Sequence, residues 1–455
     1  MRIAWLVAAG AAIAASTPAV ASANGRYPAS NQIAFSPSDP GLVVLRTTFG
    51  LLLSRDGGGS WQWLCEDALG ILSSATEDPV LGVTSGALVA TPGLANGLVV
   101  SSDTGCDWTP TTGALAGQLV KDLAVRADAP ATVVALTSTY GAHAGPDAGA
   151  GYFEQVYESA DDGASFLPVG APIDPTALAT TLDVAAADDD RLYISAVRSG
   201  TPPASLFVSY DHGGTWTERP VPIDPTLGES AIYIGAVDPA DPDLVYVRTG
   251  GPTGGSRLLV THDAGLSFTV ALELEGPMLG FALSEDGSKV YAGDVVQGLV
   301  VAPRDSLAFS ATSPIHVQCL ATQGAELWAC SDDVSGFIAG SSSDDGATFT
   351  AKLHLTAPPL LSCAADASAI ATCGGAPRQA LCSTLPGCVI DAGSPAPPPA
   401  ETRGGGGGCD MGGGGAGMGA AAAGLACAAI LRAASKGKGK GRGRRRAGGG
   451  GRGRG

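Results

Sequence analysis

One short pattern recurs along most of this chain: Ser or Thr, any residue, Asp, any residue, Gly, two further residues and an aromatic ring. Its six copies are SRDGGGSW (54–61), SSDTGCDW (101–108), SADDGASF (159–166), SYDHGGTW (209–216), THDAGLSF (261–268) and SSDDGATF (342–349). A degenerate copy, APRDSLAF (302–309), fills the long gap before the last, so seven units begin 40 to 58 residues apart. Repeats of this length indicate a β-propeller or a solenoid, in which each unit buries its apolar face against its neighbours.

Each unit has the composition of four short β-strands separated by turn residues. In the fifth unit, residues 232–237, 244–248, 257–261 and 267–272 are rich in residues that favour strands, and Pro, Asp and Gly stand between the first two runs. No part of the repeat region shows apolar residues at a sustained helical period. We therefore predict an all-β fold, a single seven-bladed β-propeller of four-stranded blades, with an eighth blade in 360–390 as the alternative.

The repeated motif resembles the Asp-box of sialidase-like and sortilin-like (BNR) β-propellers, and the resemblance covers residues 31–355. It implies a tight hairpin turn in which the Asp accepts hydrogen bonds from its own turn and the Gly takes a positive φ. One such carboxylate in each blade would be dispersed around a rim, so we expect a structural role rather than catalysis or calcium binding. The six aspartates concerned are Asp56, Asp103, Asp161, Asp211, Asp263 and Asp344.

The N-terminus points to export, and the charge of the chain excludes one class of partner. Residues 1–23 have the layout of a secretory signal peptide, with Arg2, an uncharged apolar run and a small-residue cleavage site, so we expect the mature chain to begin at Asn24. We predict that the propeller occupies 24–358. Within 24–410 there are 15 of the 26 basic residues and all 43 acidic ones, a net charge of −28. That charge excludes a generally basic nucleic-acid-binding protein.

The C-terminal part predicts a stalk and an anchor. Residues 391–408 are rich in Pro and Gly, as in an extended linker, and 409–455 combine Cys409, a short apolar helix and a basic tail. This layout resembles the tripartite C-terminal sorting tails of myxobacterial surface proteins, which implies cleavage near Cys409 and lipid attachment there. We expect the protein in the cell envelope, at the outer surface or in the periplasm, and associated with the membrane through its tail unless the tail is cleaved. An RNA-binding Gly/Arg tail is the alternative, although an exported protein rarely meets RNA.

Ten cysteines in an exported chain predict disulfides. Cys319 and Cys330 face each other across the first hairpin of the seventh unit, so we predict a bond there. We also predict a Cys65–Cys106 bond that joins the first two blades. The closing segment, 359–390, holds four cysteines whose pairing stays open among three arrangements, and it lacks the CxxC pairs and interleaved His of a zinc site. These four are Cys363, Cys373, Cys382 and Cys388.

Two sets of residues are candidates for ligand binding. Arg46, Arg198 and Arg248 recur at the end of the second strand of their units. The sialidase resemblance implies a set of three arginines that hold a carboxylate, so these side chains are candidates for anion binding on one rim. The long connection 137–155 of the third unit is the second candidate, because long loops on rigid scaffolds often bind ligands. Its candidate residues are Tyr140, His143 and Tyr152.

These features favour a non-enzymatic, exported cell-envelope protein that binds or scaffolds an envelope protein or a glycan. The first alternative is a divergent sialidase-like glycan hydrolase that uses the rim between second and third strands, although no nucleophile can be assigned because the tyrosines available lie in apolar strands. The second alternative is a protein-assembly factor resembling the Asp-box propellers that chaperone photosystem II. We expect a monomer with no cofactor, no metal and no nucleic-acid partner.

Overall fold

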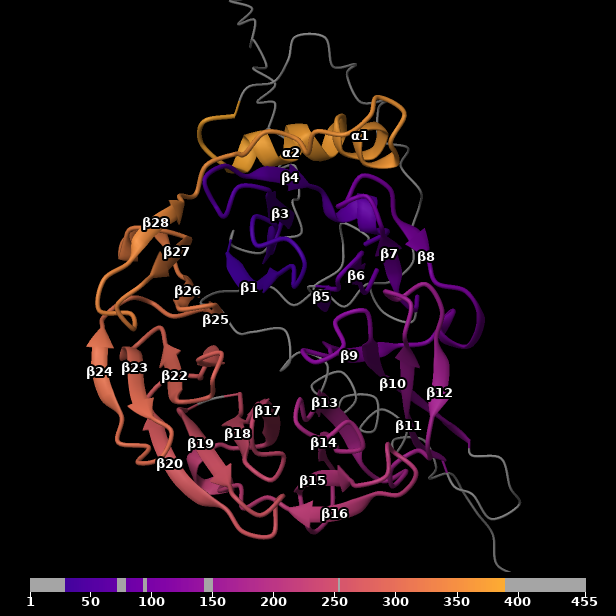
Figure 1. Cartoon of the computed structure of the whole chain (residues 1–455), viewed down its shortest axis with the longest axis vertical. Helices are drawn as coiled ribbons and strands as arrows, with labels where there is room; N and C mark the ends of the chain where they lie inside the picture. Colours follow the sequence, from indigo (N-terminus) through magenta and orange to yellow (C-terminus); the bar gives the residue numbers. More distant parts are fainter. Residues whose placement is uncertain (1–28, 72–78, 93–95, 143–149, 253, 389–455) are drawn as a thin grey trace, which may run out of the picture.

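The computed structural model describes residues 29–71, 79–92, 96–142, 150–252 and 254–388, which form seven four-stranded antiparallel sheets arranged in a ring (Figure 1). The fold is therefore a seven-bladed β-propeller, as the repeats predict. Blades 1 to 3 consist of β1 (Ser30–Phe35), β2 (Val43–Thr47), β3 (Gly50–Ser54), β4 (Gln62–Leu64), β5 (Leu81–Val83), β6 (Leu88–Ala90), β7 (Val99–Ser101), β8 (Thr109–Pro110), β9 (Val120–Val125), β10 (Val133–Ala142), β11 (Ala150–Ser159) and β12 (Leu167–Val169). Blades 4 to 7 consist of β13 (Leu178–Val184), β14 (Leu192–Val197), β15 (Ala204–Ser209), β16 (Thr217–Pro220), β17 (Ala231–Val237), β18 (Val245–Gly250), β19 (Ser256–Thr261), β20 (Thr269–Leu274), β21 (Gly280–Leu283), β22 (Lys289–Asp294), β23 (Gly298–Pro303), β24 (Ser310–Ser313), β25 (Cys319–Gln323), β26 (Glu326–Cys330), β27 (Ala339–Ser342) and β28 (Thr350–Leu353). Two helices follow, α1 (Ser368–Cys373) and α2 (Ala376–Thr384), and the connections hold the short 3-10 helices η1 (Glu66–Leu69), η2 (Gly113–Leu115), η3 (Pro225–Leu227) and η4 (Asp333–Ser335).

The apolar core lies between the blades rather than at one centre. Strand order within each blade follows the chain, and the first strand of each blade lies nearest the ring centre (Figure 1). The middle strands are the most apolar, and every residue of β3, β14 and β15 is buried. Tyr193 and Val208 of blade 4, for example, share one buried cluster with Ile232 and Val247 of blade 5. Strands covered on both faces favour such continuous apolar runs, which explains why each unit needs its neighbours.

Direct packing of blade 7 on blade 1 closes the ring. Every described blade consists of four consecutive strands, so no blade is shared between the two ends of the chain. The rings of Phe35 and Trp328 meet edge to face with centroids 5.6 Å apart, and Trp61 Nε1 donates a hydrogen bond to the Lys352 carbonyl oxygen (3.1 Å). Side-chain packing therefore supplies the closure that a shared blade supplies in other rings.

The segment after β28 returns to the outer edge of blade 1 and forms helices, so the alternative of an eighth blade is wrong (Figure 1). Trp63 N–H donates to the Pro359 carbonyl oxygen (2.7 Å), and Leu361 N–H donates to the Trp63 carbonyl oxygen (2.8 Å). Beyond this short pairing the sequence is rich in Ala, which favours helix, and Pro377 suits the first turn of α2.

Four disulfides lie within the described residues: Cys319–Cys330, Cys65–Cys373, Cys106–Cys363 and Cys382–Cys388. The first is the predicted hairpin bond, but the predicted Cys65–Cys106 bond is wrong. Both of these cysteines bond instead to the closing segment, because that segment lies along the outer edges of blades 1 and 2, where Ala369 N–H donates to the Cys106 carbonyl oxygen (3.1 Å). The two bonds span 308 and 257 residues and tie the end of the ring to its beginning.

The predicted signal peptide (1–23), the linker (391–408) and the tail with Cys409 lie outside the described residues. Within the part of the chain that the structure describes, no helix is long and apolar enough to cross a membrane.

Candidate binding surfaces at the ring centre and on blade 3

The six copies of the repeated motif form matching turns between the third and fourth strands of their blades. In blade 4, Ser209 Oγ donates to Asp211 Oδ1 (2.9 Å) and accepts the Gly213 N–H (2.7 Å). Asp211 Oδ1 also accepts the Thr215 N–H (2.8 Å). In all six turns the residue after the Asp and the following Gly have φ between +52° and +98°, which explains the fixed glycine. We call these six segments the repeat turns.

The carboxylates of the repeat turns accept hydrogen bonds from groups of their own turns. The side-chain hydroxyl and then the backbone N–H of the residue four positions later lower the pKa of Asp56, Asp263 and Asp344 to about 2. In the same way Asp161 and Asp211 accept hydrogen bonds from Ser and Thr of their own turns. The aspartates lie one to a blade, and their bonding suits a structural clasp rather than a shared reaction centre.

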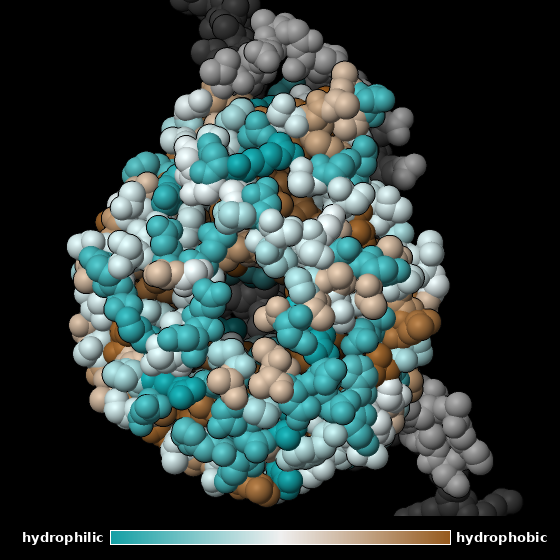
Figure 2. Space-filling model, viewed as in Figure 1, coloured by the Kyte–Doolittle hydropathy of each residue, from teal (hydrophilic) through white to brown (hydrophobic). Residues whose placement is uncertain are grey.

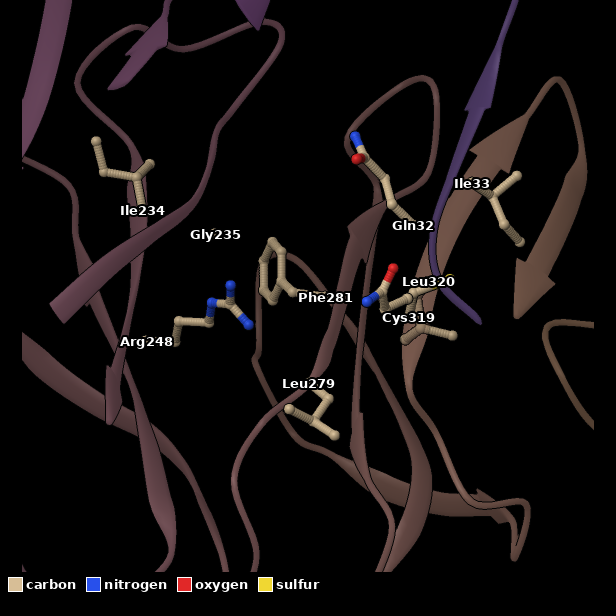
Figure 3. Close-up of a pocket in the computed structure, with 10 residues that line it drawn as sticks. Gln32, Ile33, Ile234, Gly235, Arg248, Leu279, Phe281, Cys319 and Leu320 are labelled. Atoms are coloured by element: carbon tan, nitrogen blue, oxygen red, sulfur yellow. The ribbon is translucent and has the colours of Figure 1, made fainter. Parts of the chain in front are cut away.

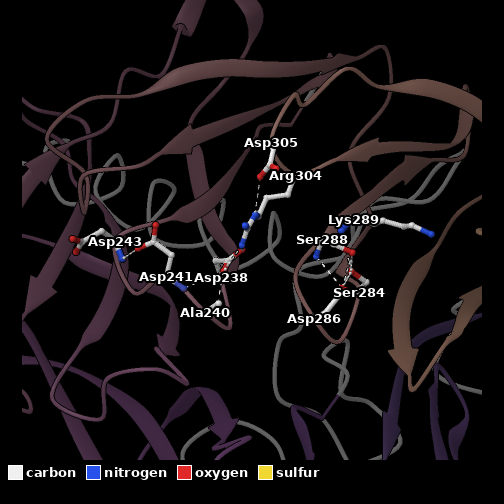
Figure 4. A network of polar contacts seen from close by, with 10 residues as sticks. All are labelled: Asp238, Ala240, Asp241, Asp243, Ser284, Asp286, Ser288, Lys289, Arg304 and Asp305. Atoms are coloured by element: carbon white, nitrogen blue, oxygen red, sulfur yellow. Dashed lines mark hydrogen bonds and ion pairs between the residues drawn. The ribbon is translucent and has the colours of Figure 1, made fainter.

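Blade 6 lacks this clasp because Arg304 stands at the aspartate position (Figure 4). Its Nη1 lies 3.3 Å from Asp238 Oδ1 of blade 5, and its Nε lies 3.3 Å from Asp305 Oδ1. Asp238 is completely buried and also accepts the N–H groups of Ala240 (2.9 Å) and Asp241 (3.1 Å). An ion pair between two blades therefore replaces the clasp within one turn.

The three arginines proposed as an anion site do not converge on one pocket. Arg198 follows the last residue of β14 and pairs with carboxylates of its own blade and the connection before it. Its Nη2 lies 2.5 Å from Glu218 Oε1, and its Nη1 lies 3.5 Å from Asp174 Oδ2. These carboxylates occupy the guanidinium that the sialidase resemblance would assign to a ligand.

Arg46 stands one layer behind the ring centre. Its Nε donates to Asn31 Oδ1 (2.8 Å), and its Nη1 donates to the Pro79 carbonyl oxygen (2.8 Å). Asn31 in turn lines a cavity at the ring centre. Arg46 therefore positions a lining residue and is not itself part of the lining.

A cavity of about 140 Å³ lies where the first strands of blades 1, 5, 6 and 7 face one another, and Figure 2 shows the ring hollowed at its centre. We call it the central cavity. Its lining includes Gln32, Ile234, Leu279, Phe281 and Leu320, together with Arg248 of β18 (Figure 3). The lining thus combines apolar side chains with the polar groups of Asn31, Gln32 and Arg248.

Arg248 is the cation of the central cavity. Its Nη1 donates to the Met278 carbonyl oxygen (2.7 Å), and its guanidinium lies 5.3 Å from the centroid of the Tyr233 ring. Its Nε is buried and has no hydrogen-bond partner in the described part of the chain. Burial lowers the pKa of Arg248, but a guanidinium stays charged in proteins. A buried donor without a partner costs about 1–3 kcal/mol.

Two carboxyl groups near the ring centre were not predicted from the sequence. Burial raises the pKa of Asp122, on β9, to about 7 and that of Asp183, on β13, to about 6. Asp122 Oδ2 accepts the Leu182 N–H of blade 4 (3.0 Å), and Asp183 Oδ2 accepts the Val237 N–H of blade 5 (2.9 Å). They join neighbouring blades, and the available signal was an Asp within a first strand, where this residue type is uncommon.

Hairpin β10–β11 of blade 3 continues beyond its blade. β10 pairs with β9 only as far as Thr137, whereas it pairs with β11 as far as Ala142. On this extension the rings of Tyr140 and Tyr152 lie opposite each other with centroids 5.1 Å apart. Tyr140 is 58% exposed and Phe153 is 43% exposed. We call residues 138–142 and 150–154 the hairpin extension.

The base of the hairpin extension is anchored to the ring. Ser138 Oγ donates to Glu154 Oε1 (2.8 Å), and Tyr152 N–H donates to the Pro175 carbonyl oxygen before blade 4 (2.8 Å). Glu154 is buried, and its burial raises the pKa of this carboxyl to about 7. His143, the third residue predicted for this surface, lies outside the described residues.

Seven four-stranded blades around a central cavity make this chain an all-β, seven-bladed β-propeller with a helical closing segment. Its four disulfides indicate an oxidising, extracellular type of environment. Among the described residues, no group of three or more His, Cys, Asp and Glu is placed to hold a metal ion.

No protein-family model matches the chain, and no curated protein is similar to it in sequence. Among solved structures, it is similar to the GH74 enzyme of Niastella koreensis (14% identity over 73% of this chain and 72% of that chain, TM-score 0.29). It is also similar to YCF48 from Cyanidioschyzon merolae (13% identity, 66% and 92%, TM-score 0.46) and to Saccharomyces cerevisiae Sqt1 (10% identity, 71% and 85%, TM-score 0.45). Likenesses at these identities concern the propeller fold alone.

Proposed function

We propose that this protein is an exported binding or scaffold module of the cell envelope, without catalysis of its own. We further propose that the hairpin extension is its contact surface for an envelope protein. The observation that carries the proposal is a two-stranded extension that presents exposed aromatic rings from a rigid, disulfide-closed ring.

The composition of the hairpin extension supports protein binding. Side chains alternate between the two faces of a strand, so Tyr140 and Tyr152 share one face and Phe153 lies on the other. Aromatic rings dominate the energetics of interfaces, and Tyr combines a large apolar area with a polar tip. Because the base is fixed by Glu154 and Ser138, little ordering of the backbone would oppose binding.

Three features of the sequence support export and display. The signal peptide at 1–23 would carry the chain out, the disulfides suit the compartment it reaches, and the tail from Cys409 would hold it at the envelope. In this proposal the repeat turns are Asp-boxes that stiffen the blades. A client that is being assembled, rather than a permanent partner, is one form that the bound envelope protein could take.

The alternative of a divergent glycan hydrolase has less support. It requires arginines, a carboxylate and a tyrosine nucleophile in one pocket, but Arg198 is paired within blade 4. Burial raises the pKa of Tyr193 to about 12, and its hydroxyl donates to the Pro242 carbonyl oxygen (2.6 Å), so it is a poor nucleophile.

Site-specific photo-crosslinking in intact cells tests this function. A photoreactive residue placed at Tyr140 or Phe153 should give one discrete adduct with an envelope protein. The matched control is Leu266, which is 66% exposed but lies in a repeat turn, on the opposite rim of the ring. The same adducts from all three positions, or none from the hairpin extension, would rule out this contact surface. Adducts only with cytoplasmic proteins would rule out export.

A further inference from the structure

We propose that the central cavity is a binding site for a small monocarboxylate with a compact apolar body, and that Arg248 holds the carboxylate. This site is separate from the hairpin extension. Its test does not depend on whether the function proposed above is correct. It rests on the charge, shape and unsatisfied polar atoms of the cavity.

The charge argument compares Arg248 with other arginines of the ring. Five arginines that are mostly buried each have a carboxylate partner: Arg126 with Asp128, Arg191 with Asp243, Arg198 with Glu218, Arg257 with Glu229 and Arg304 with Asp238. Arg248 has a backbone carbonyl and an aromatic face instead, and no carboxylate of the described residues forms an ion pair with it. A guanidinium is well suited to hold a planar carboxylate through two parallel hydrogen bonds.

The apolar walls define the body of the ligand. Leu279 and Phe281 lie beside Arg248 in the lining of the cavity (Figure 3), and Ile234 is a further lining residue. Gly235 leaves room for the Phe281 ring, because a Cβ atom on Gly235 would come within 3.0 Å of Phe281 Cδ1. A cavity of about 150 Å³ in another protein accommodates benzene, so a six-membered ring or a short branched chain fits a space of this size.

Unsatisfied polar atoms mark the same place. Two buried atoms that have no hydrogen-bond partner among the described residues, Arg248 Nε and Gln32 Oε1, belong to residues that line the central cavity. The Gln32 Nε2 group donates a hydrogen bond to the Leu81 carbonyl oxygen (3.0 Å). Buried polar atoms are normally paired, so this wall of the cavity is incompletely satisfied within the described residues.

Neighbouring acids favour a ligand with a single negative charge. Asp122 lies close enough for its charge to act on Arg248, and Asp183 acts on Asp122 in turn. When ionised, Asp122 opposes any negative charge on the ligand beyond the one that the Arg248 guanidinium neutralises. A monocarboxylate is therefore favoured over phosphate or a dicarboxylate.

The test is a binding series on the full-length protein, measured by calorimetry and by saturation-transfer NMR. Benzoate and isobutyrate are the probes, benzamide and benzylamine are the neutral and cationic counterparts of benzoate, and inorganic phosphate is the small-anion control. We expect saturable binding of the two acids with a dissociation constant on the order of 1 mM, as suits so few atoms. We expect no saturable binding of benzamide, benzylamine or phosphate.

Two substitutions locate the site. Arg248→Gln should weaken benzoate binding by about tenfold or more, whereas Arg198→Gln, at the end of the equivalent strand of blade 4, should change it by less than about twofold. Arg248→Lys keeps the charge but loses the planar fork, so it should retain part of the affinity if Arg248→Gln does not fold. Benzamide binding as tight as benzoate, unchanged binding in both Arg248 variants, or no saturable acid binding would each overturn the proposal.

Discussion

The glycine of a repeat turn is constrained by its own backbone and, in most of the six turns, by the neighbouring blade. Gly346 has φ +86°, and a Cβ atom there would lie 2.1 Å from Leu299 Cδ2 of blade 6. Gly324 has φ +57° in an open turn, with nothing within 4 Å of a Cβ atom. The two positions separate backbone strain from steric collision.

We expect Gly346→Ala to lower the free energy of unfolding by about 2–5 kcal/mol, because left-handed strain adds to overpacking. Gly324→Ala should cost only about 1–2 kcal/mol, from the backbone alone. Urea unfolding of both variants measures the difference. If the two variants lost the same free energy of unfolding, Leu299 of blade 6 would move aside for the added methyl group at no energetic cost.

The first residue of the repeat turn is as constrained as the aspartate. Ser209 is fully buried, donates to Asp211 and accepts the Gly213 N–H. Ser209→Ala leaves that buried N–H without an acceptor, so we expect a loss of about 1–3 kcal/mol in the free energy of unfolding. Ser310→Ala, at an exposed position of β24, is the control and should stay within about 0.5 kcal/mol. A neutral result for Ser209→Ala would mean that water replaces the hydroxyl.

The closing segment, residues 359–388 in the structure, adds covalent bonds to the packing that closes the ring. Two bonds, Cys65–Cys373 and Cys106–Cys363, hold it, and their separations of 308 and 257 residues differ by 51. When one bond is removed, the other still closes most of the chain. The remaining bond therefore limits how much entropy the unfolded state regains.

Replacing Cys106 and Cys363 by Ser should therefore lower the free energy of unfolding by about 4 kcal/mol, the value for a loop of about 50 residues. Replacing all four cysteines should cost more than twice as much, because the full loop opens only then. Guanidinium unfolding measures both variants. The control replaces Cys382 and Cys388 by Ser; because these residues are only six positions apart, the loss of free energy of unfolding should be smaller. If the variant without all four cysteines lost no more than twice the free energy of unfolding that the Cys106 and Cys363 variant loses, the two bonds would not act together on one large loop.

The elements of the ring were largely predictable, because the pattern of each unit is local. The four strands expected for the fifth unit correspond to β17, β18, β19 and β20 within a few residues. The partners of Cys65 and Cys106 were not predictable, since repeat spacing says nothing about where a segment beyond the repeats returns. Helices α1 and α2 escaped prediction because they depend on that docking, which propensity alone does not reveal.

The directions of the three arginines were also beyond the sequence. Arg248 is followed by two more residues of β18, whereas Arg198 comes after the last residue of β14. Counted from the residue that pairs with the first residue of the repeat turn, Arg248 is fourth and Arg198 is seventh. Side chains alternate between the faces of a strand, so this odd difference places the two side chains on opposite faces. The repeat spacing predicted that the three arginines lie near the end of their strands. It did not predict whether each side chain points to the ring centre or into the interior of its blade.

At the scale of the whole molecule, carboxyls with opposite pKa shifts act on the stability of the ring. Asp122 and Asp183 have folded pKa values raised to about 7 and about 6, above the ordinary value of 3.8. Their contribution to stability is complete below pH 3.8 and is lost as the pH rises through 6 to 7. The repeat-turn aspartates with pKa values near 2 contribute stability above pH 3.8 that is lost as the pH falls toward 2. The ring should therefore be most stable in mildly acidic solution.

Asp122→Asn tests this balance, because an amide cannot ionise. Ionisation of such a carboxyl costs the folded protein about 1.4 kcal/mol for each pH unit between the unfolded and folded pKa values, less where solvent reaches it. Between pH 5 and pH 8 the free energy of unfolding of the variant should fall less steeply than that of the wild type, by about 1–3 kcal/mol over the interval. Asp305→Asn, whose side chain is 89% exposed, should keep the wild-type slope.

Urea unfolding at each pH measures how steeply the free energy of unfolding changes with pH. The slopes are compared rather than the absolute stabilities, because an amide accepts only one of the two backbone N–H groups that Asp122 binds and so lowers stability at every pH. Parallel slopes for Asp122→Asn and the wild type would mean that Asp122 is already ionised in the folded ring at pH 5, so that the first strand of blade 3 carries a full charge next to the central cavity.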